Sequence, residues 1–295
     1  MATLINPSVR PVAFDQKLIV HNTIPNSPKG DRVRHMGEEL VLVKKEGDIA
    51  VLTINRPKAY NSLNTELVAA LGKAMDDIAA DEAIRCVILT GAGDKAFVAG
   101  ADIKEMVEMN AQQARAFMRK GHTVMNKIQY LEKPIIAAIN GFCLGGGLEV
   151  AMSCDIRYAA DTAKLGLPEV GLGIHPGFGG TQRLARLVGQ GKASELVFTA
   201  DQIDANEALR IGLVQKVVPV AKLMEEVMAL AKRIASKGPI AVRLAKASLN
   251  AGLASDFRTG LNYEVETVTQ TFATEDLREG MKAFIEKRKP EFKNK

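Results

Sequence analysis

The segment IIAAINGFCLGGGLEVAMSCDIRYAADTAKLGLPEVGLGIHPGFGG, residues 135–180, gives the strongest indication of how this chain folds. Its apolar start predicts a buried strand, which leads into a triple glycine, Gly145 to Gly147, and then into a segment with helical spacing. That helix carries one carboxylate, Glu149, and a second, Glu169, follows in a Leu-Pro-Glu turn. Bare backbone at a helix start beside two acids indicates a site that stabilises negative charge and moves protons.

Strands and helices alternate on both sides of this segment. Residues 40–44 and 49–55 flank a Glu-Gly-Asp turn and predict a hairpin. Short apolar runs predict further strands over residues 86–90, 134–139 and 155–160. Helical spacing predicts helices over residues 65–79 and 111–130. The recurring pattern with drifting spacing favours an α/β fold of stacked β-β-α turns over a flat Rossmann sheet.

The chain divides into three parts by its patterns. Residues 1–37 are rich in Pro, Asn and Ser and lack a sustained period, so we expect an N-terminal extension. Residues 38–200 hold the strand-rich spiral core, and residues 201–295 form a helical region. From Gly189 onward strands become rare, and helices are expected over residues 192–198, 205–211, 220–236, 240–254, 257–272 and 277–288.

Composition is that of an ordinary globular protein. Of 295 residues, 47% are hydrophobic and 25% charged, and the net charge of +5 involves no block of like charges. No stretch is long and apolar enough for a membrane span, and the N-terminus lacks the apolar region of a secretory signal. Three cysteines, Cys86, Cys143 and Cys154, have no metal-like spacing, so we expect reduced thiols, no metal site and a cytoplasmic location.

Two glycine turns are candidates for binding an oxyanion. The N–H groups that open a helix lack internal partners and lie at the positive end of its dipole, and glycine lets a ligand oxygen approach them closely. Gly145–Gly147 supplies one such turn, and Ala99-Gly100-Ala101-Asp102 supplies another. The alternative is that the glycines serve only tight packing of helix against strand. Likewise Glu149 and Glu169 are either partners in one pocket or unrelated surface acids.

Other familiar sites lack support in the sequence. The glycine pattern matches neither a dinucleotide fingerprint nor a Walker loop, and no serine lies in a G-x-S-x-G elbow. His175 lies in a Gly/Pro turn, where a structural role is the more common one.

Five blocks of the chain together resemble the crotonase superfamily, and specifically enoyl-CoA hydratases. They are NRPKAYNSL (55–63), AFVAGADIKEM (96–106), NGFCLGGGLE (140–149), LPEVGLGIHPGFGGTQR (167–183) and EGMKAFIEKR (279–288). The resemblance extends from about residue 39 to residue 293. It implies a spiral of β-β-α turns with a C-terminal helical region that forms trimers, usually stacked in pairs.

The resemblance also implies a reaction and roles for individual residues. The reaction is reversible addition of water across the C2=C3 bond of a 2-enoyl-CoA, with no metal or redox cofactor, because CoA is part of the substrate. Ala101 and Gly146 match the family's oxyanion hole, and Glu149 and Glu169 match its two catalytic acids. Glutamate at both positions favours a hydratase among the sister enzymes of the superfamily.

Further positions match those that bind substrate or CoA in the family. Lys58 and Ala59 match the loop along the pantetheine and adenine, and Lys104 lies near the same path. Phe284 and Lys287 match positions that reach CoA from a neighbouring subunit. The remaining expected contacts are Ala99, Asp102, Ile103, Gly145, Pro168 and Gly177. Residues 106–125 shape the acyl pocket. The matching motifs do not determine this region, so the acyl-chain length stays open.

Two alternatives stay open at the level of sequence. One is another acyl-CoA reaction on the same fold, such as double-bond isomerisation or hydration of a cyclic dienoyl-CoA. The other is an RNA-binding homologue, since Arg115, Arg119, Lys120 and Lys127 give one predicted helix a basic face. That helix lacks interleaved aromatic residues beyond Phe117, and the net charge is modest, so we expect no nucleic-acid partner. We expect no membrane partner and a homo-oligomer, a trimer or a dimer of trimers.

Overall fold

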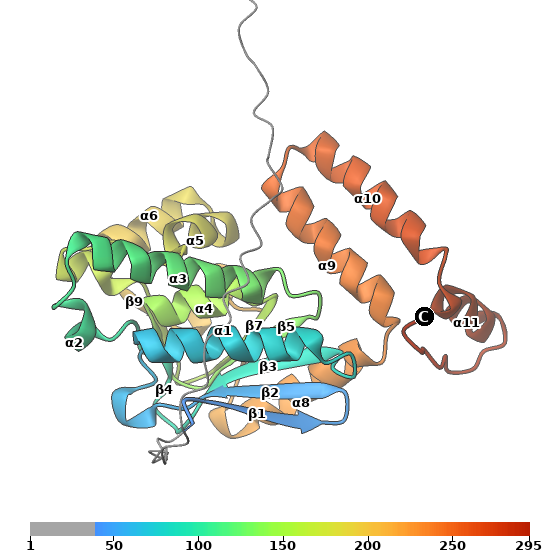
Figure 1. The fold of residues 1–295 in the computed structure, drawn as a ribbon, viewed down its shortest axis with the longest axis horizontal. Coiled ribbons are helices and arrows are strands. Elements are labelled where there is room, and N and C mark those ends of the chain that lie inside the picture. The colour runs from blue at the N-terminus through green and yellow to red at the C-terminus, as the bar shows by residue number, and fades with distance from the viewer. Residues whose placement is uncertain (1–38) are drawn as a thin grey trace, which may run out of the picture. The chain divides into compact units, whose positions relative to one another are not determined.

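The structure, a computed structural model, describes residues 39–295 of the chain. Two β-sheets form the framework of these residues. The extension expected over residues 1–37 lies outside these residues. Within them, the larger sheet has six strands in the order β1-β2-β3-β5-β7-β10 (Figure 1). They are β1 (Val41–Glu46), β2 (Ile49–Ile54), β3 (Cys86–Gly91), β5 (Ile135–Ile139), β7 (Ile156–Ala160) and β10 (Lys216–Val218). The expected hairpin β1–β2 is antiparallel, and the other neighbours pair in parallel.

A second sheet consists of short strands. In the described range it has the order β4-β6-β8-β9. Its members are β4 (Ala96–Val98), β6 (Phe142–Leu144), β8 (Lys164–Gly166) and β9 (Gln202–Asp204). β4, β6 and β8 each follow a strand of the larger sheet, and helical structure follows each such pair. From β3 to β8, successive strands therefore go to alternate sheets, which confirms the predicted spiral of β-β-α turns and excludes the flat Rossmann sheet.

Helices complete each turn of the spiral and make up most of the C-terminal part. Over residues 39–295 they are α1 (Thr65–Ala80), α2 (Ile103–Met106), α3 (Ala111–Gln129), α4 (Gly146–Ser153), α5 (Gly180–Val188), α6 (Gln190–Thr199), α7 (Ala205–Arg210), α8 (Leu223–Ala235), α9 (Pro239–Ala254), α10 (Phe257–Thr271) and α11 (Glu275–Ile285). Three short 3₁₀ helices are η1 (Pro57–Ala59), η2 (Pro168–Leu172) and η3 (Val220–Lys222).

Some elements differ from those expected. The helix predicted over residues 220–236 begins as a 3₁₀ turn, and α8 proper starts at Leu223. The patterns in the sequence do not predict α5 or the strands β6, β8, β9 and β10. These strands have only three residues each, which is too short for a recognisable period, and pairing with neighbouring strands holds them in the sheets.

Apolar side chains cover both faces of the larger sheet. All six residues of β3 and all five of β5 are buried, as their continuous apolar runs predict. On one face Ile88 and Ile136 pack with Val227 and Ala231 of α8, which lies on the opposite side of the sheet from α1 (Figure 1). On the other face Leu89 and its neighbours belong to the main core shared with α1, α3, α4 and the second sheet.

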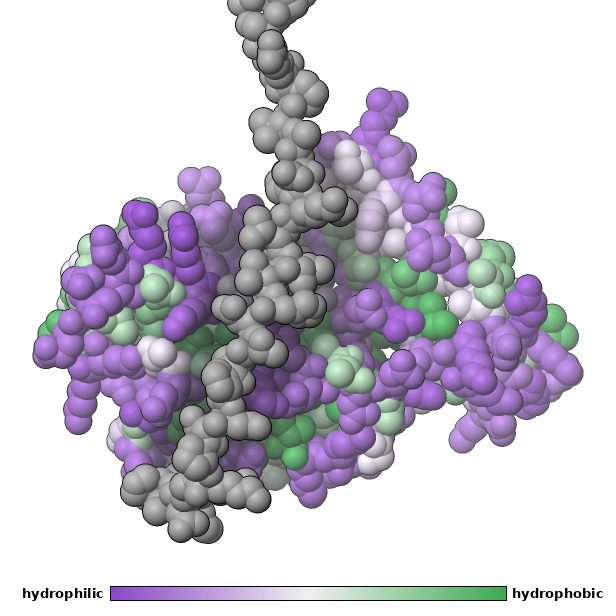
Figure 2. Space-filling model, in the orientation of Figure 1, coloured by the Kyte–Doolittle hydropathy of each residue, from purple (hydrophilic) through white to green (hydrophobic). Residues whose placement is uncertain are grey.

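The helices α9 and α10 form a hairpin that extends away from the spiral, followed by α11 (Figure 1). Lys246 of α9 anchors this hairpin, since its Nζ lies 2.8 Å from Asp155 Oδ2 and donates to the Lys133 carbonyl at 3.1 Å. Large apolar side chains remain exposed on the hairpin, among them Leu253 and Phe257, which are 77% and 81% exposed. Figure 2 shows such apolar surface among the hydrophilic side chains of these helices.

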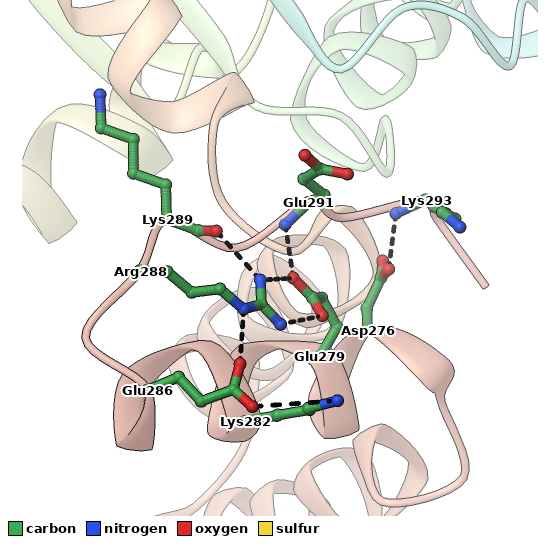
Figure 3. A network of polar contacts seen from close by, with 8 residues as sticks. All are labelled: Asp276, Glu279, Lys282, Glu286, Arg288, Lys289, Glu291 and Lys293. Carbon is green, nitrogen blue, oxygen red and sulfur yellow. Dashed lines mark hydrogen bonds and ion pairs between the residues drawn. The ribbon is translucent and has the colours of Figure 1, made fainter.

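A polar network fixes the turn after α11 (Figure 3). Arg288 donates two hydrogen bonds to Glu279, at 2.6 and 2.8 Å, and one to Glu286 at 2.7 Å. Asp276 accepts the Lys293 N–H at 2.6 Å and so ties the last residues to the start of the helix. Between α11 and Arg288, Lys287 adopts a left-handed conformation with φ of 55°.

Candidate active site

The candidate site is a cavity of about 120 Å³ at the junction of the two glycine turns with α4, η2 and the start of α5. It brings together nine of the expected site residues: Ala99, Ala101, Ile103, Gly145, Gly146, Glu149, Pro168, Glu169 and Gly177. Met106 and Met118 also line it, in line with the acyl pocket expected over residues 106–125. Leu172, Ile174 and Phe178 complete the wall, and sequence reasoning did not single them out because nothing in their spacing links them to the acids.

Two backbone N–H groups are available at this cavity. Leu63 holds the peptides on either side of Ala101: its N–H donates to Gly100 O at 2.8 Å, and its carbonyl accepts from Asp102 N at 2.9 Å. The Ala101 N–H itself has no acceptor among residues 39–295, and neither has the Gly146 N–H at the first position of α4. A Cβ on Gly146 would lie 3.6 Å from Ala101 N, so the two groups are neighbours.

The three consecutive glycines meet three different demands. Gly145 has a φ of +51°, which favours glycine, and a Cβ there would lie 2.9 Å from Glu169 Oε1. Gly146 leaves space beside the Ala101 N–H. A Cβ on Gly147 would lie only 2.0 Å from Val98 O, so this glycine permits close packing of α4 on β4. The packing alternative therefore holds for Gly147, whereas Gly145 and Gly146 border the cavity.

A buried polar scaffold supports the turn that carries Ala101. Asp102 caps α2 by accepting from Lys104 N at 3.1 Å, and it pairs with Arg56 Nη1 at 2.7 Å. Asn61 is fully buried and accepts the Arg56 N–H at 2.9 Å, while its Nδ2 donates to Ala96 O at 2.8 Å. The Asn-Arg-Pro…Asn-Ser-Leu block thus holds one wall of the site, and Asp102 acts in this scaffold instead of lining the cavity.

Glu149 is a buried carboxylate held by backbone donors. It lies in the first turn of α4 with only 2% of its surface exposed. Its Oε1 accepts hydrogen bonds from Phe178 N at 2.7 Å and from Gly180 N at 2.6 Å. Burial raises the pKa of Glu149 to about 7, helped by the nearby Glu169, while the two N–H donors and Arg183 oppose the rise.

Glu169 faces the same cavity from η2. Pro168 opens this 3₁₀ helix and fixes the approach of the chain. Burial raises the pKa of Glu169, and the nearby His175 opposes that rise. Its Oε2 is buried without a hydrogen-bond partner among the described residues. Because buried polar atoms are normally paired, this oxygen is suited to a proton or to a ligand. His175 also lines the cavity and is exposed, with Nδ1 2.9 Å from the Pro176 carbonyl oxygen.

The other expected contacts lie outside the lining of the cavity. Lys58 and Ala59 form η1, and Lys104 lies in the first turn of α2. Phe284 lies at the end of α11 and is 85% exposed, and Lys287 lies in the turn after this helix. The expected acids and oxyanion-hole residues thus line one cavity, whereas these expected CoA-binding positions do not line it.

The described residues contain neither a metal-binding cluster nor a membrane-spanning helix. No group of three or more His, Cys, Asp or Glu side chains in residues 39–295 could hold a metal ion. Over the same residues no helix is both long and apolar enough to cross a membrane.

Comparison with known proteins relates this site to a family. A family model described as enoyl-CoA hydratase/isomerase matches residues 44–295. The chain is 54% identical over 256 residues to a short-chain-enoyl-CoA hydratase of Clostridium acetobutylicum, covering 86% of this chain and 98% of the relative. It is 52% identical over 260 residues to a crotonyl-CoA hydratase of Syntrophomonas wolfei, covering 88% of this chain and all of that protein.

Solved structures agree with this assignment. The crystal structure of an enoyl-CoA hydratase from Bacillus anthracis superposes with a TM-score of 0.85 at 45% identity, over 87% of this chain and 100% of that one. The fold, the sequence and the two-carboxylate cavity thus lead to the same conclusion: the chain belongs to the enoyl-CoA hydratase/isomerase family, and its activity is that of an enoyl-CoA hydratase, a hydro-lyase.

Proposed function

We propose that this chain hydrates short-chain 2-enoyl-CoA thioesters with Glu149 and Glu169 as its acid–base pair and with the Ala101 and Gly146 N–H groups as its oxyanion hole. The observation that carries the proposal is the meeting, at one cavity, of a buried and a half-buried carboxyl group with two backbone N–H groups that have no acceptor among residues 39–295. Such a combination of charge stabilisation and proton transfer is what addition of water to an enoyl thioester needs.

The first step is polarisation of the thioester. A carbonyl oxygen placed between the two N–H groups accepts two hydrogen bonds, and these strengthen as negative charge builds up in the enolate. The Gly146 N–H also lies at the positive end of the α4 dipole, which favours an anion there. Carbon C3 becomes electrophilic because the conjugated double bond transmits this polarisation.

The second requirement is one proton shared by two acids. Two neighbouring carboxyl groups do not both ionise readily, and burial raises the pKa of Glu149 to about 7 and raises the pKa of Glu169 as well, so we take the working form to be singly protonated. The Glu149 anion accepts two N–H bonds from other residues, whereas the Glu169 carboxylate has its own backbone N–H as a donor and its Oε2 has no partner among residues 39–295. We therefore assign the negative charge to Glu149 and the proton to Glu169.

Addition then follows from this distribution. Glu149 accepts a proton from a water molecule as its oxygen bonds to C3, and Glu169 gives its proton to C2 as the enolate collapses. Water and thioester supply all the atoms, and proton exchange with solvent returns the proton from Glu149 to Glu169 after each turnover, so we propose no cofactor beyond the CoA that is part of the substrate. The reverse reaction dehydrates a 3-hydroxyacyl-CoA through the same groups.

Two observations support a preference for short acyl chains. The relatives compared above carry the names short-chain-enoyl-CoA hydratase and crotonyl-CoA hydratase. The cavity of about 120 Å³ is also smaller than the roughly 150 Å³ apolar cavity that holds a six-carbon benzene. Met118 narrows it, because its Sδ would lie 2.5 Å from a Cβ placed on Gly177.

The remaining contacts are proposed for the CoA portion and for assembly. Lys58, Ala59 and Lys104 would contact CoA along the rim, and Phe284 and Lys287 would reach the CoA of a neighbouring subunit. The exposed apolar side chains of α9 and α10, such as Leu253 and Phe257, support a homo-oligomer, a trimer or a dimer of trimers. We further propose a cytoplasmic location, consistent with three buried free cysteines.

The experiment is a steady-state assay with crotonyl-CoA that follows loss of the conjugated enoyl thioester absorbance. Glu169→Gln keeps the size of the side chain and removes the acid, so kcat should fall about 10²–10⁴-fold. Products are identified by mass, since hydration adds one water and isomerisation adds none. A wild-type protein that isomerises enoyl-CoA without gain of water would contradict the proposal, as would a Glu169→Gln variant with full activity.

A further inference from the structure

Arg183 on α5 connects the turn that holds Glu149 to the neighbouring helix α3. Its Nη1 donates a hydrogen bond to the Phe178 carbonyl at 3.0 Å. Its Nε donates to Gln129 Oε1 at 2.9 Å, and its Nη2 donates to Asn126 Oδ1 at 3.3 Å. Gln129 and Asn126 both belong to α3, so one planar guanidinium ties a loop and a helix together.

The turn that Arg183 holds is the one that fixes the carboxylate. Phe178 N and Gly180 N donate to Glu149 Oε1, and the carbonyl of the same residue Phe178 accepts from Arg183. Gly179 lies between the two donors with a φ of +104°, and a Cβ there would lie 2.2 Å from Arg183 Nη1. The glycine therefore allows both the left-handed turn and the close approach of the guanidinium.

We propose that Arg183 is a positioning residue for hydration, because it fastens the Phe178–Gly180 turn to α3 and so holds the two N–H groups that orient Glu149. The inference rests on the proposed function, in which Glu149 takes the proton from water. Arg183 does not touch the substrate in this account. It acts through the turn, and its positive charge also favours the ionised form of the carboxylate.

The other ionisable groups around Glu149 have different roles. Burial raises the pKa of Glu149. Glu169 faces Glu149 from η2 and raises this pKa further, whereas Arg183 on α5 lowers it. His122 of α3 faces the turn, with its Cε1 3.9 Å from a Cβ placed on Gly179, and His175 faces Glu169. Of these groups in the described chain, Arg183 alone has hydrogen bonds to both the turn and α3.

The test compares kcat and KM for crotonyl-CoA hydration across pH 5.5–9 in full-length wild type, Arg183→Gln, Arg183→Lys and the control Arg186→Gln. Arg186 lies on the same helix, and within residues 39–295 its Nη1 donates hydrogen bonds to Gln182 alone. In Arg183→Gln, kcat should fall about 10²-fold with KM little changed, because the base is misplaced. The rising acid limb of kcat should also move to higher pH, because a positive charge near the base is lost.

Arg183→Lys separates the two effects. The ammonium keeps the charge and cannot span three acceptors, so kcat should fall while the acid limb stays where it is in wild type. Arg186→Gln should match wild type in both respects. A thermal unfolding curve of each variant gives the fraction of protein that is folded at the assay temperature.

Several results would overturn the inference. These are wild-type kinetics in Arg183→Gln, a loss of kcat with an unmoved acid limb in that variant, or a loss that equals the unfolded fraction. In each case a wild type that hydrates crotonyl-CoA leaves the proposed function standing. By contrast, a wild type without hydratase activity would contradict the proposed function itself.

Discussion

Replacing Glu149 with glutamine should weaken catalysis and strengthen the fold at the same time. The amide keeps the size of the side chain and an oxygen that can accept the Phe178 and Gly180 N–H bonds, at present 2.7 and 2.6 Å long. What disappears is the negative charge and the ability to take a proton from water. The variant therefore isolates the chemistry of the carboxylate from its packing.

The expected loss of activity follows from the role of a general base. Such a group contributes about 10²–10⁴-fold in rate, or roughly 3–5 kcal/mol of activation free energy. The fall should appear in kcat, with little change in KM, since Glu149 is proposed to act on water and not to bind CoA.

The expected gain in stability follows from the pKa of the buried group. Folding raises the pKa of Glu149 from 4.5 to about 7, because burial penalises the charged form. Below pH 4.5 the Glu149 carboxyl group is protonated in both the unfolded and the folded state and costs no stability. As the pH rises from 4.5 to about 7, the group ionises more readily in the unfolded state, so the free energy of unfolding falls over this range. The loss amounts to roughly 3 kcal/mol above pH 7. Glutamine has no such penalty.

The assay is urea unfolding of wild type and Glu149→Gln at pH 5 and pH 8, beside crotonyl-CoA hydration at pH 8. The free energy of unfolding of the variant relative to wild type should be larger at pH 8 than at pH 5, by an amount approaching the full penalty. Glu66→Gln, at an exposed position on α1, serves as the control and should change neither property. A variant that keeps its kcat, or whose relative stability does not rise with pH, would refute this reasoning.

Three further perturbations test other parts of the site and fold. Gly146→Ala places a Cβ 3.6 Å from Ala101 N, and by crowding the oxyanion hole it should lower kcat about 10²–10³-fold in the same assay, whereas unchanged turnover would argue against that hole. Met118→Ala enlarges the cavity and should raise kcat/KM for eight-carbon relative to four-carbon enoyl-CoA; an unaltered ratio across a substrate panel would contradict its place in the acyl pocket. Lys246→Ala removes the buried ammonium that lies 2.8 Å from Asp155, a carboxylate whose side chain is 26% exposed, and should lower the free energy of unfolding by roughly 1–3 kcal/mol in urea, while an unchanged free energy of unfolding would show the pair to be dispensable.

The repeating architecture could be predicted because its signals are local. Continuous apolar runs such as residues 86–90 have no face that tolerates water, so they indicate strands buried on both sides, and all of β3 is buried. The hairpin of β1 and β2 follows from two alternating runs around a tight turn. Strands β9 and β10 could not be predicted, since three residues show no period and only their neighbours in the sheets make them strands.

The candidate site, like the fold, could be predicted only in part from the sequence. The order of the amino acids alone shows which groups are present: two glutamates twenty positions apart, a triple glycine that opens a helix, and blocks that resemble one superfamily. It left open whether the glutamates share a pocket and whether the glycines serve packing or a ligand. Gly147 serves packing and Gly146 borders the cavity, a difference that depends on where Val98 and Ala101 lie in space.

The properties that depend on distance through space follow from the folded arrangement and not from any local pattern. The raised pKa of Glu149 arises from burial, from N–H donors 29 and 31 residues away, and from the proximity of Glu169. The hydrogen bonds from Arg183 to α3 join residues 54 and 57 positions apart, so no local sequence pattern predicts them. Secondary structure reflects each residue's immediate neighbours in the chain, whereas desolvation and charge–charge interaction depend on which groups folding brings together.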